Sequence, residues 1–173
     1  MPSVKNLLFL AVAATGSVIK RDAAQITNGL RLINKDILTL KVAVNSYSGG
    51  VSGAIPILGA QQTLTGDVKS TTDEVNNTPS VSEAESDAIF TYIKDQLAVS
   101  LQSFIKALES KKSIFDHDHL TSAVVAAVKS SQESTEHLSN ALMAKAPGSF
   151  AARAKALKDE IDHQFEDAIA YFS

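Results

Sequence analysis

The sequence predicts an all-α protein, a single domain folded as an antiparallel up-and-down bundle of about five amphipathic helices. From Asp22 onward, apolar residues recur every three or four positions, with little of the alternation typical of strands. Glycine and proline signals divide this stretch into five segments. A chain of 173 residues, 45% of them hydrophobic, is also long enough to bury one substantial core.

The first amphipathic segment follows Asp22 and ends near Gly49 and Gly50, because glycine readily adopts the left-handed conformation that stops a helix. Its apolar residues are spaced by steps of three and four, which places them on one face of a helix. They are Ile26, Leu30, Ile33, Ile37, Leu40 and Val44.

The second segment is expected to begin near Pro56, which a first helical turn tolerates, and to end before Pro79. Its apolar residues are Ile57, Leu64, Val68 and Val75. The third segment opens with a capping box, in which Ser82 and Glu85 would satisfy each other's free backbone amides. Its stripe consists of Phe90, Ile93, Leu97, Leu101, Phe104 and Leu108.

The fourth segment runs from about Leu120 to Met143, and the fifth follows a turn at residues 146–149. The fourth carries Leu120, Val124, Val128, Leu138 and Leu142. The fifth carries Phe150, Ala154, Leu157, Ile161, Phe165, Ala168 and Phe172. Short connections between helices of this length predict that successive helices are antiparallel neighbours.

The N-terminus has the order of a secretory signal peptide, predicted for residues 1–16: Lys5, then an apolar run, then small residues. The run is too short to span a bilayer. Lys20 and Arg21 form a dibasic processing site. We therefore expect a short propeptide at residues 17–21 and a mature domain at residues 22–173, released from the cell or associated with the cell wall without a lipid anchor.

Composition and motifs exclude several classes of function. The absence of cysteine excludes disulfides and thiolate metal sites, and a net charge of −3 argues against nucleic acid as a partner. No catalytic or nucleotide-binding motif is present, so we expect neither an enzyme nor a cofactor. His117 and His119 are two residues apart, which does not suit ligation from one helix. We interpret residues 115–119 as a solvated loop rather than a metal site.

Polar residues interrupt the apolar stripes of the second and fourth segments. Gln61, Ser131 and Thr135 occupy positions where the stripes need apolar side chains, and Thr71 or Thr72 does the same. One explanation is that these two helices pack peripherally. The other is that small and polar residues leave room for a largely aliphatic cavity, as a lipid site requires. Gln61, Ser131 and Thr135 are then the candidate ligand-binding residues.

Asn76 begins the one N-glycosylation sequon of the chain, Asn76-Asn77-Thr78, and is a candidate glycan site. Pro79 follows the sequon directly and would lower its occupancy. The last residues lack the apolar tail that precedes a glycolipid anchor. The sequence thus predicts no transmembrane segment and no lipid anchor.

The order of these features resembles the fungal hydrophobic surface-binding protein A family, which includes cell-wall galactomannoprotein antigens. The features are the signal peptide, Lys20-Arg21, the helix opening at residues 22–26, Gly49-Gly50, the connection from Lys111-Lys112 to Phe115, and the closing amphipathic helix. The resemblance implies a secreted helical protein that adsorbs to hydrophobic surfaces and can help bring degradative enzymes to them. It also implies a domain that encloses fatty acids.

Two functions remain open at this point. The first is a non-enzymatic protein that binds hydrophobic surfaces or fatty-acid-like lipids through the interior of the bundle, with a secreted hydrolase as a further partner. The second is a structural, antigenic cell-wall mannoprotein without a ligand. Uptake of lipid by the delipidated protein distinguishes the two. A hydrolase would be revealed by ester turnover that one substitution abolishes.

Overall fold

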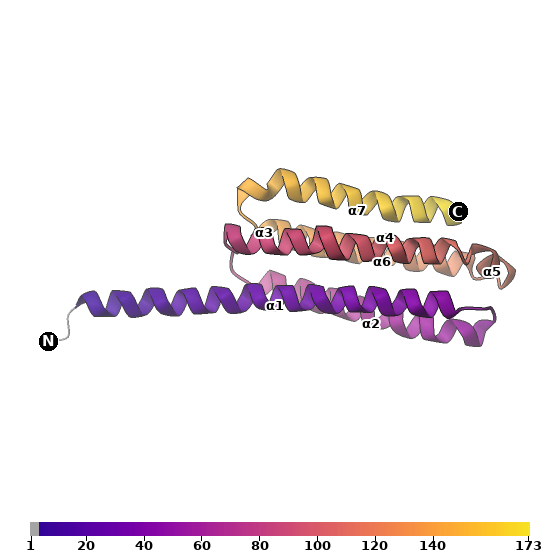
Figure 1. Cartoon of the computed structure of the whole chain (residues 1–173), viewed down its shortest axis with the longest axis horizontal. Coiled ribbons are helices and arrows are strands. Elements are labelled where there is room, and N and C mark those ends of the chain that lie inside the picture. The colour runs from indigo at the N-terminus through magenta and orange to yellow at the C-terminus, as the bar shows by residue number, and fades with distance from the viewer. Residues whose placement is uncertain (1–3) are drawn as a thin grey trace.

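The computed structural model describes the backbone of residues 4–173 and the side chains of residues 23–173. All regular secondary structure in this part of the chain is helical (Figure 1), which confirms the predicted fold class. The helices are α1 (Val4–Ser46), α2 (Val51–Asn77), α3 (Glu83–Tyr92), α4 (Ala98–Glu109), α5 (Lys112–His117), α6 (Thr121–Lys145) and α7 (Ala151–Phe172). A π-helical turn, Ile93–Leu97, joins α3 to α4, and a 3-10 turn, Gly148–Phe150, precedes α7.

The long helices form a closed ring. α1 packs on α2, α2 on α6, α6 on α7, α7 on α4, and α4 back on α1. In Figure 1 these helices run side by side, with α7 on one side of the bundle, α4 and α6 in the middle, and α1 and α2 on the other side. Each helix therefore turns its apolar stripe toward a common axis. The axis of this ring is where a core or a cavity must lie.

Local signals in the sequence set the helix ends. Ser82 caps α3: its hydroxyl accepts a hydrogen bond from the Glu85 backbone N–H at 3.3 Å, while the Ser82 N–H donates to the Glu85 carboxylate at 2.9 Å. This is the capping box that the sequence predicted. Gly49 and Gly50 lie between α1 and α2 and have positive φ angles of 114° and 81°. Glycine adopts this backbone conformation readily, which allows the chain to reverse direction there.

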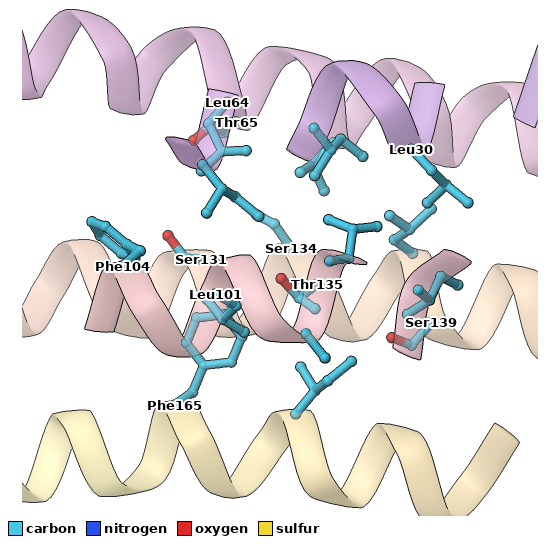
Figure 2. A pocket seen from close by; sticks show the side chains of 18 of the residues that line it. Leu30, Leu64, Thr65, Leu101, Phe104, Ser131, Ser134, Thr135, Ser139 and Phe165 are labelled. Carbon is cyan, nitrogen blue, oxygen red and sulfur yellow. The ribbon is translucent and has the colours of Figure 1, made fainter. Parts of the chain in front are cut away.

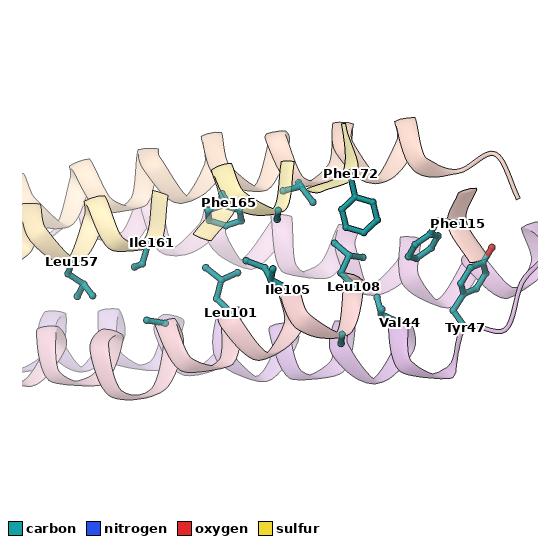
Figure 3. Close-up of a cluster of buried hydrophobic side chains, with 14 residues drawn as sticks. Val44, Tyr47, Leu101, Ile105, Leu108, Phe115, Leu157, Ile161, Phe165 and Phe172 are labelled. Atoms are coloured by element: carbon teal, nitrogen blue, oxygen red, sulfur yellow. The ribbon is translucent and has the colours of Figure 1, made fainter. Parts of the chain in front are cut away.

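The apolar stripes of α1 and α7 lie almost entirely in the core. All six predicted stripe residues of α1 are buried, and so are six of the seven predicted for the fifth segment, namely five in α7 and Phe150 just before it. Figure 3 shows one buried cluster, which extends from Leu157 at one end to Tyr47 and Phe115 at the other. The rings of Tyr47 and Phe115 stack there with centroids 4.9 Å apart.

Thr71 explains one polar interruption in the stripe of α2. Its side chain is buried against Gly29 of α1, where a Cβ atom added to the glycine would lie 2.5 Å from Thr71 Oγ1 and 2.8 Å from Cγ2. A methyl group has no room in such a contact. α1 and α2 therefore approach closely because one helix presents glycine and the other presents a compact side chain.

Two expectations need correction. α2 begins at Val51 rather than near Pro56, and Pro56 lies within the helix. The glycine turn sets the start instead, because Gly50 precedes α2 and its carbonyl accepts a hydrogen bond from the Gly53 N–H at 3.0 Å. Residues 115–119 are also not simply a solvated loop, because residues up to His117 belong to α5 and Phe115 is buried.

Asp118 attaches this region to the first turn. Its carboxylate accepts hydrogen bonds from the Tyr47 hydroxyl and from the Gly50 N–H, the latter at 2.7 Å. The Tyr47 hydrogen bond, followed by those from His117 and Gly50, lowers the pKa of Asp118 to about 2. Burial, together with the Asp118 carboxylate, raises the pKa of Tyr47 to about 12. The aspartate thus joins the α1–α2 turn to the α5–α6 connection.

Asp36 is a buried acid in the contact between α1 and α2. It is 9% exposed, and one of its carboxylate oxygens has no hydrogen-bond partner among the described residues. Burial is the main cause that raises the pKa of Asp36 from 3.8 to about 6. The neighbouring Asp67 carboxyl on α2 raises it further, and Lys35 opposes the rise. A charged Asp36 therefore destabilises the fold at neutral pH.

The predicted signal peptide (1–16), propeptide (17–21) and dibasic site, Lys20 and Arg21, fall outside the residues whose side chains are described. They stay predictions. None of the described helices is long and apolar enough to cross a membrane.

Gly29→Ala should destabilise the protein by about 1–3 kcal/mol, because the new methyl group overlaps Thr71 and forces α1 and α2 apart. Gly66→Ala is the matched control, since a Cβ there meets no atom within 4 Å. That substitution should stabilise α2 by about 0.5–1 kcal/mol. Urea denaturation measures both, and equal effects of the two alanines would contradict this role for Gly29.

Acid should stabilise the protein between about pH 7 and pH 4. The folded chain retains a proton on Asp36 up to about pH 6, whereas the unfolded chain loses it near pH 3.8. The free energy of unfolding should therefore rise, by on the order of 2 kcal/mol, as the pH falls through this range. Asp36→Asn should raise stability at pH 7 and remove most of this dependence.

Urea denaturation at several pH values provides the measurement. Asp73→Asn, at an exposed position of α2, is the control and should leave the pH dependence intact. A wild-type stability that is flat or falls from pH 7 to pH 5 would show that Asp36 does not hold a proton in this way.

Candidate functional site: three apolar cavities inside the bundle

A cavity of about 90 Å³ lies on the axis of the bundle and is lined by residues of all the long helices. We call it the central cavity (Figure 2). Its walls are mainly aliphatic and aromatic, with hydroxyl groups supplied mostly by α6. Residues that line it include Leu30, Leu64, Leu101, Phe104, Ser131, Thr135 and Phe165. None of its described lining residues is charged.

One further cavity lies on each side of the central cavity. The Ser86 cavity, of about 80 Å³, is lined by residues that include Ile26, Ser86, Ile89, Phe150 and Leu157. The Ala127 cavity, of about 240 Å³, is lined by residues that include Val44, Ile57, Leu108, Phe115 and Ala127. Both are also predominantly apolar.

The lining residues place the three cavities in series along the bundle axis. On α1, Ile26 lines the Ser86 cavity, Leu30 to Ile37 line the central cavity, and Leu40 and Val44 line the Ala127 cavity. α6 runs antiparallel and shows the reverse order. From Ile26 to Val44 the row is about 27 Å long, at 1.5 Å per helical residue.

Shared side chains divide the row. Phe104, Ser131 and Phe165 line both the central cavity and the Ala127 cavity. The central cavity and the Ser86 cavity share four other residues, Ile93, Ser139, Leu142 and Ile161. These partitions consist of side chains, which can change rotamer, rather than of backbone. The row can therefore become continuous through side-chain movement alone.

The structure brings the three candidate binding residues to the two larger cavities. Gln61 lines the Ala127 cavity, Thr135 lines the central cavity, and Ser131 lines both. The Gln61 side-chain N–H donates to the Ser131 hydroxyl at 2.9 Å, and that hydroxyl donates to the Ala127 carbonyl at 2.9 Å. Gln61 and Ser131 thus satisfy one another within the wall. Their role in binding a ligand stays a prediction.

The sequence analysis missed other residues of the site. Ser139 lines the partition next to the Ser86 cavity, and it follows Ser131 and Thr135 at the same spacing of four along α6. Extending that polar series would have found it. Phe104 and Phe165 were assigned only to core stripes, and nothing in their spacing distinguishes a partition from a packed core.

The start of α2 exposes a row of large apolar side chains beside the Ala127 cavity. Val51, Ile55 and Leu58 are 77%, 63% and 60% exposed, and all three also line that cavity. Residues 51–66 contain no charged side chain. This part of α2 therefore presents an uncharged apolar face to solvent and forms a wall of the interior at the same time.

The remaining candidate positions lie away from the cavities. Asn76 is exposed near the end of α2, while Thr78 of its sequon is buried and donates its hydroxyl to the Glu74 carbonyl at 2.8 Å. Glycan attachment at Asn76 stays a prediction. Across residues 23–173, no group of three or more histidine, aspartate or glutamate side chains is arranged to hold a metal ion.

Comparison with solved structures finds the same fold in fungal proteins with bound fatty acids. AfMp4p in complex with palmitic acid aligns with a TM-score of 0.84 and 28% identity, over 87% of this chain and 99% of that one. Ligand binding domain 1 of Penicillium marneffei MP1, complexed with arachidonic acids, aligns with a TM-score of 0.82 and 18% identity. That alignment covers 88% of this chain and 99% of the domain.

Ligand binding domain 2 of the same MP1 protein, complexed with multiple arachidonic acids, has a TM-score of 0.80 and 20% identity. It covers 87% of this chain and 95% of that domain. No curated protein matches the chain significantly. The family model of hydrophobic surface binding protein A matches residues 23–144, most of the chain, and confirms the resemblance seen in the sequence. This chain therefore belongs to the hydrophobic surface binding protein A family.

Proposed function

We propose that this protein is a secreted, non-enzymatic binding protein that encloses the acyl chain of a fatty acid in its row of three cavities. The observation that carries the proposal is the serial arrangement of apolar cavities along one axis. An extended chain of sixteen carbons is roughly 20 Å long, at roughly 1.2 Å per bond. The row of about 27 Å accommodates such a chain together with its carboxyl group.

The energetics support this assignment. Burying about 14 methylene groups at about 0.8 kcal/mol each contributes roughly 11 kcal/mol before the costs of association. Those costs and the ordering of the acyl chain bring the expected affinity to between micromolar and nanomolar. The palmitic acid complex of AfMp4p, at 28% identity, adds support from a protein of the same fold.

Native mass spectrometry of the purified protein tests the proposal directly. We expect a bound mass of a few hundred daltons that disappears on delipidation and returns when palmitic acid is added. A protein that takes up no fatty acid after delipidation would instead favour the alternative, a structural cell-wall mannoprotein. Heavy mannosylation at Asn76 or at hydroxyl residues would be the corresponding positive evidence.

Ala127→Phe should lower the affinity for an acid of eighteen carbons by at least about tenfold, because the new ring occupies the Ala127 cavity and shortens the row. Decanoic acid, which needs less of the row, should bind within about twofold of its wild-type affinity. Ala126→Phe is the control, since Ala126 is exposed and lines none of the three cavities. Calorimetric titration measures all three proteins, and equal losses for both acids would contradict this use of the cavity.

The exposed face of α2 supports a second activity, adsorption to hydrophobic surfaces. Replacing Val51, Ile55 and Leu58 together by serine should remove most adsorption to hydrophobic beads, because these side chains supply the uncharged apolar contact. The control replaces Leu32, Leu38 and Val42, which are exposed on α1, by serine. Similar loss in both variants would assign adsorption to general hydrophobicity rather than to α2.

Recruitment of a secreted hydrolase to such a surface is a further expectation of this activity.

A further inference from the structure

The hydroxyl of Ser86 is a buried polar group without a partner. Ser86 lies in the first turn of α3, is 4% exposed, and lines the Ser86 cavity. Its Oγ atom makes no hydrogen bond to any described residue. A buried hydroxyl without a hydrogen-bond partner costs roughly 1–3 kcal/mol. Such a group needs an explanation, and a ligand in the adjoining cavity would supply the missing partner.

The charges around the three cavities are distributed unequally. No described residue lining the central cavity or the Ala127 cavity is charged. The Ser86 cavity has two lysines among its lining residues, Lys145 and Lys158, and no acidic residue. It is therefore the only one of the three whose described walls combine a free hydrogen-bond donor with positive charge.

The two lysines are held in place by other groups. Lys145 donates to the Asn76 carbonyl at 2.9 Å, and Lys158 contacts Asp162 at 2.6 Å and Glu136 at 3.4 Å. Arg153 lies over the rings of Phe90 and Phe150, which also line this cavity. Arg153 is itself paired with Asp87 at 3.1 Å, so neighbouring carboxylates balance most of the positive charge, and the Ser86 hydroxyl is the donor that is free for a direct contact.

The Ala127 cavity, at the opposite end of the row, and the central cavity offer a carboxyl group no positive charge from their described lining residues. Gln61 and Ser131 are the polar side chains lining the Ala127 cavity, and they already bond to each other. Ser134 in the central cavity donates to the Ser130 carbonyl at 2.9 Å. A carboxylate placed at these positions would have to break existing hydrogen bonds, and it would lie in an uncharged apolar environment.

We propose that the carboxyl group of the enclosed fatty acid lies in the Ser86 cavity and accepts a hydrogen bond from Ser86, while its acyl chain extends through the central cavity toward the Ala127 cavity. This inference rests on the proposed function and adds the direction of the ligand to it. It also specifies the ligand class as free carboxylic acids, in preference to esters of the same chain length.

Binding of palmitic acid and of methyl palmitate to delipidated Ser86→Ala tests the contact. The affinity for palmitic acid should fall about ten- to a hundredfold, because a hydrogen bond to a charged group is lost. The affinity for the methyl ester should change by no more than about twofold. Ser130→Ala, at an exposed position of α6 that lines none of the three cavities, is the matched control and should leave both affinities unchanged.

Thermal denaturation of the ligand-free proteins separates a structural role of Ser86 from a role in binding. Ser86→Ala should raise the Tm, because it removes an unsatisfied polar group, even as it weakens binding of the acid. If Ser86→Ala weakens the acid and the ester equally, or weakens neither, the proposed contact is wrong.

The direction of the chain is tested by NMR with nitroxide-labelled stearic acids. A label near the carboxyl group should broaden the amide signal of Ile89 on α3, and a label near the methyl end should broaden that of Leu58 on α2. The reverse pattern would overturn this inference and leave the proposed function intact. Failure to bind both the acid and the ester would overturn both.

Discussion

The closed ring of five long helices is the constraint on which the rest of the structure depends. The chain has no cysteine to link its helices, so the fold relies on burial of apolar stripes about a common axis. The stripes of α1 and α7 supply large side chains that fill their side of the interior. α2 and α6 supply glutamine, serine, threonine and alanine instead, and the axis between them stays partly empty. All five helices line the cavities, but the small and polar side chains that leave space there come mainly from α2 and α6.

Polar groups inside the bundle serve different purposes according to their partners. Thr71 on α2 packs against Gly29 and permits the close contact of α1 with α2, and Gln61 with Ser131 forms a satisfied pair in a partition. Asp36 and Ser86 are alike in that each carries a buried oxygen without a partner, yet they lie in different places. Asp36 lies in the packed contact between α1 and α2, where it makes stability depend on pH. Ser86 lies in a cavity wall, where its free hydroxyl can serve a ligand.

Much of the fold could be predicted from local patterns. The 3.6-residue period, the capping box at Ser82 and the glycines at the first turn each depend on neighbours within a few residues, and the structure confirms all three. The start of α2 and the nature of residues 115–119 could not be predicted in this way. Asp118 is ordered by Tyr47 and Gly50, which are about 70 residues away, and Phe115 by its stack on Tyr47.

The sequence by itself determined the helical class, the division into amphipathic segments, the lack of cysteine chemistry and the polar interruptions at Gln61, Ser131 and Thr135. Only the tertiary structure decided that these interruptions face a row of cavities, that Gln61 and Ser131 bond each other while Ser86 has no partner among the described residues, and that the lysines lie at one end. The physical reason is that a cavity is the volume which several helices together leave unfilled. No single helix encodes it, because the side chains that fill or leave that space come from five separate segments.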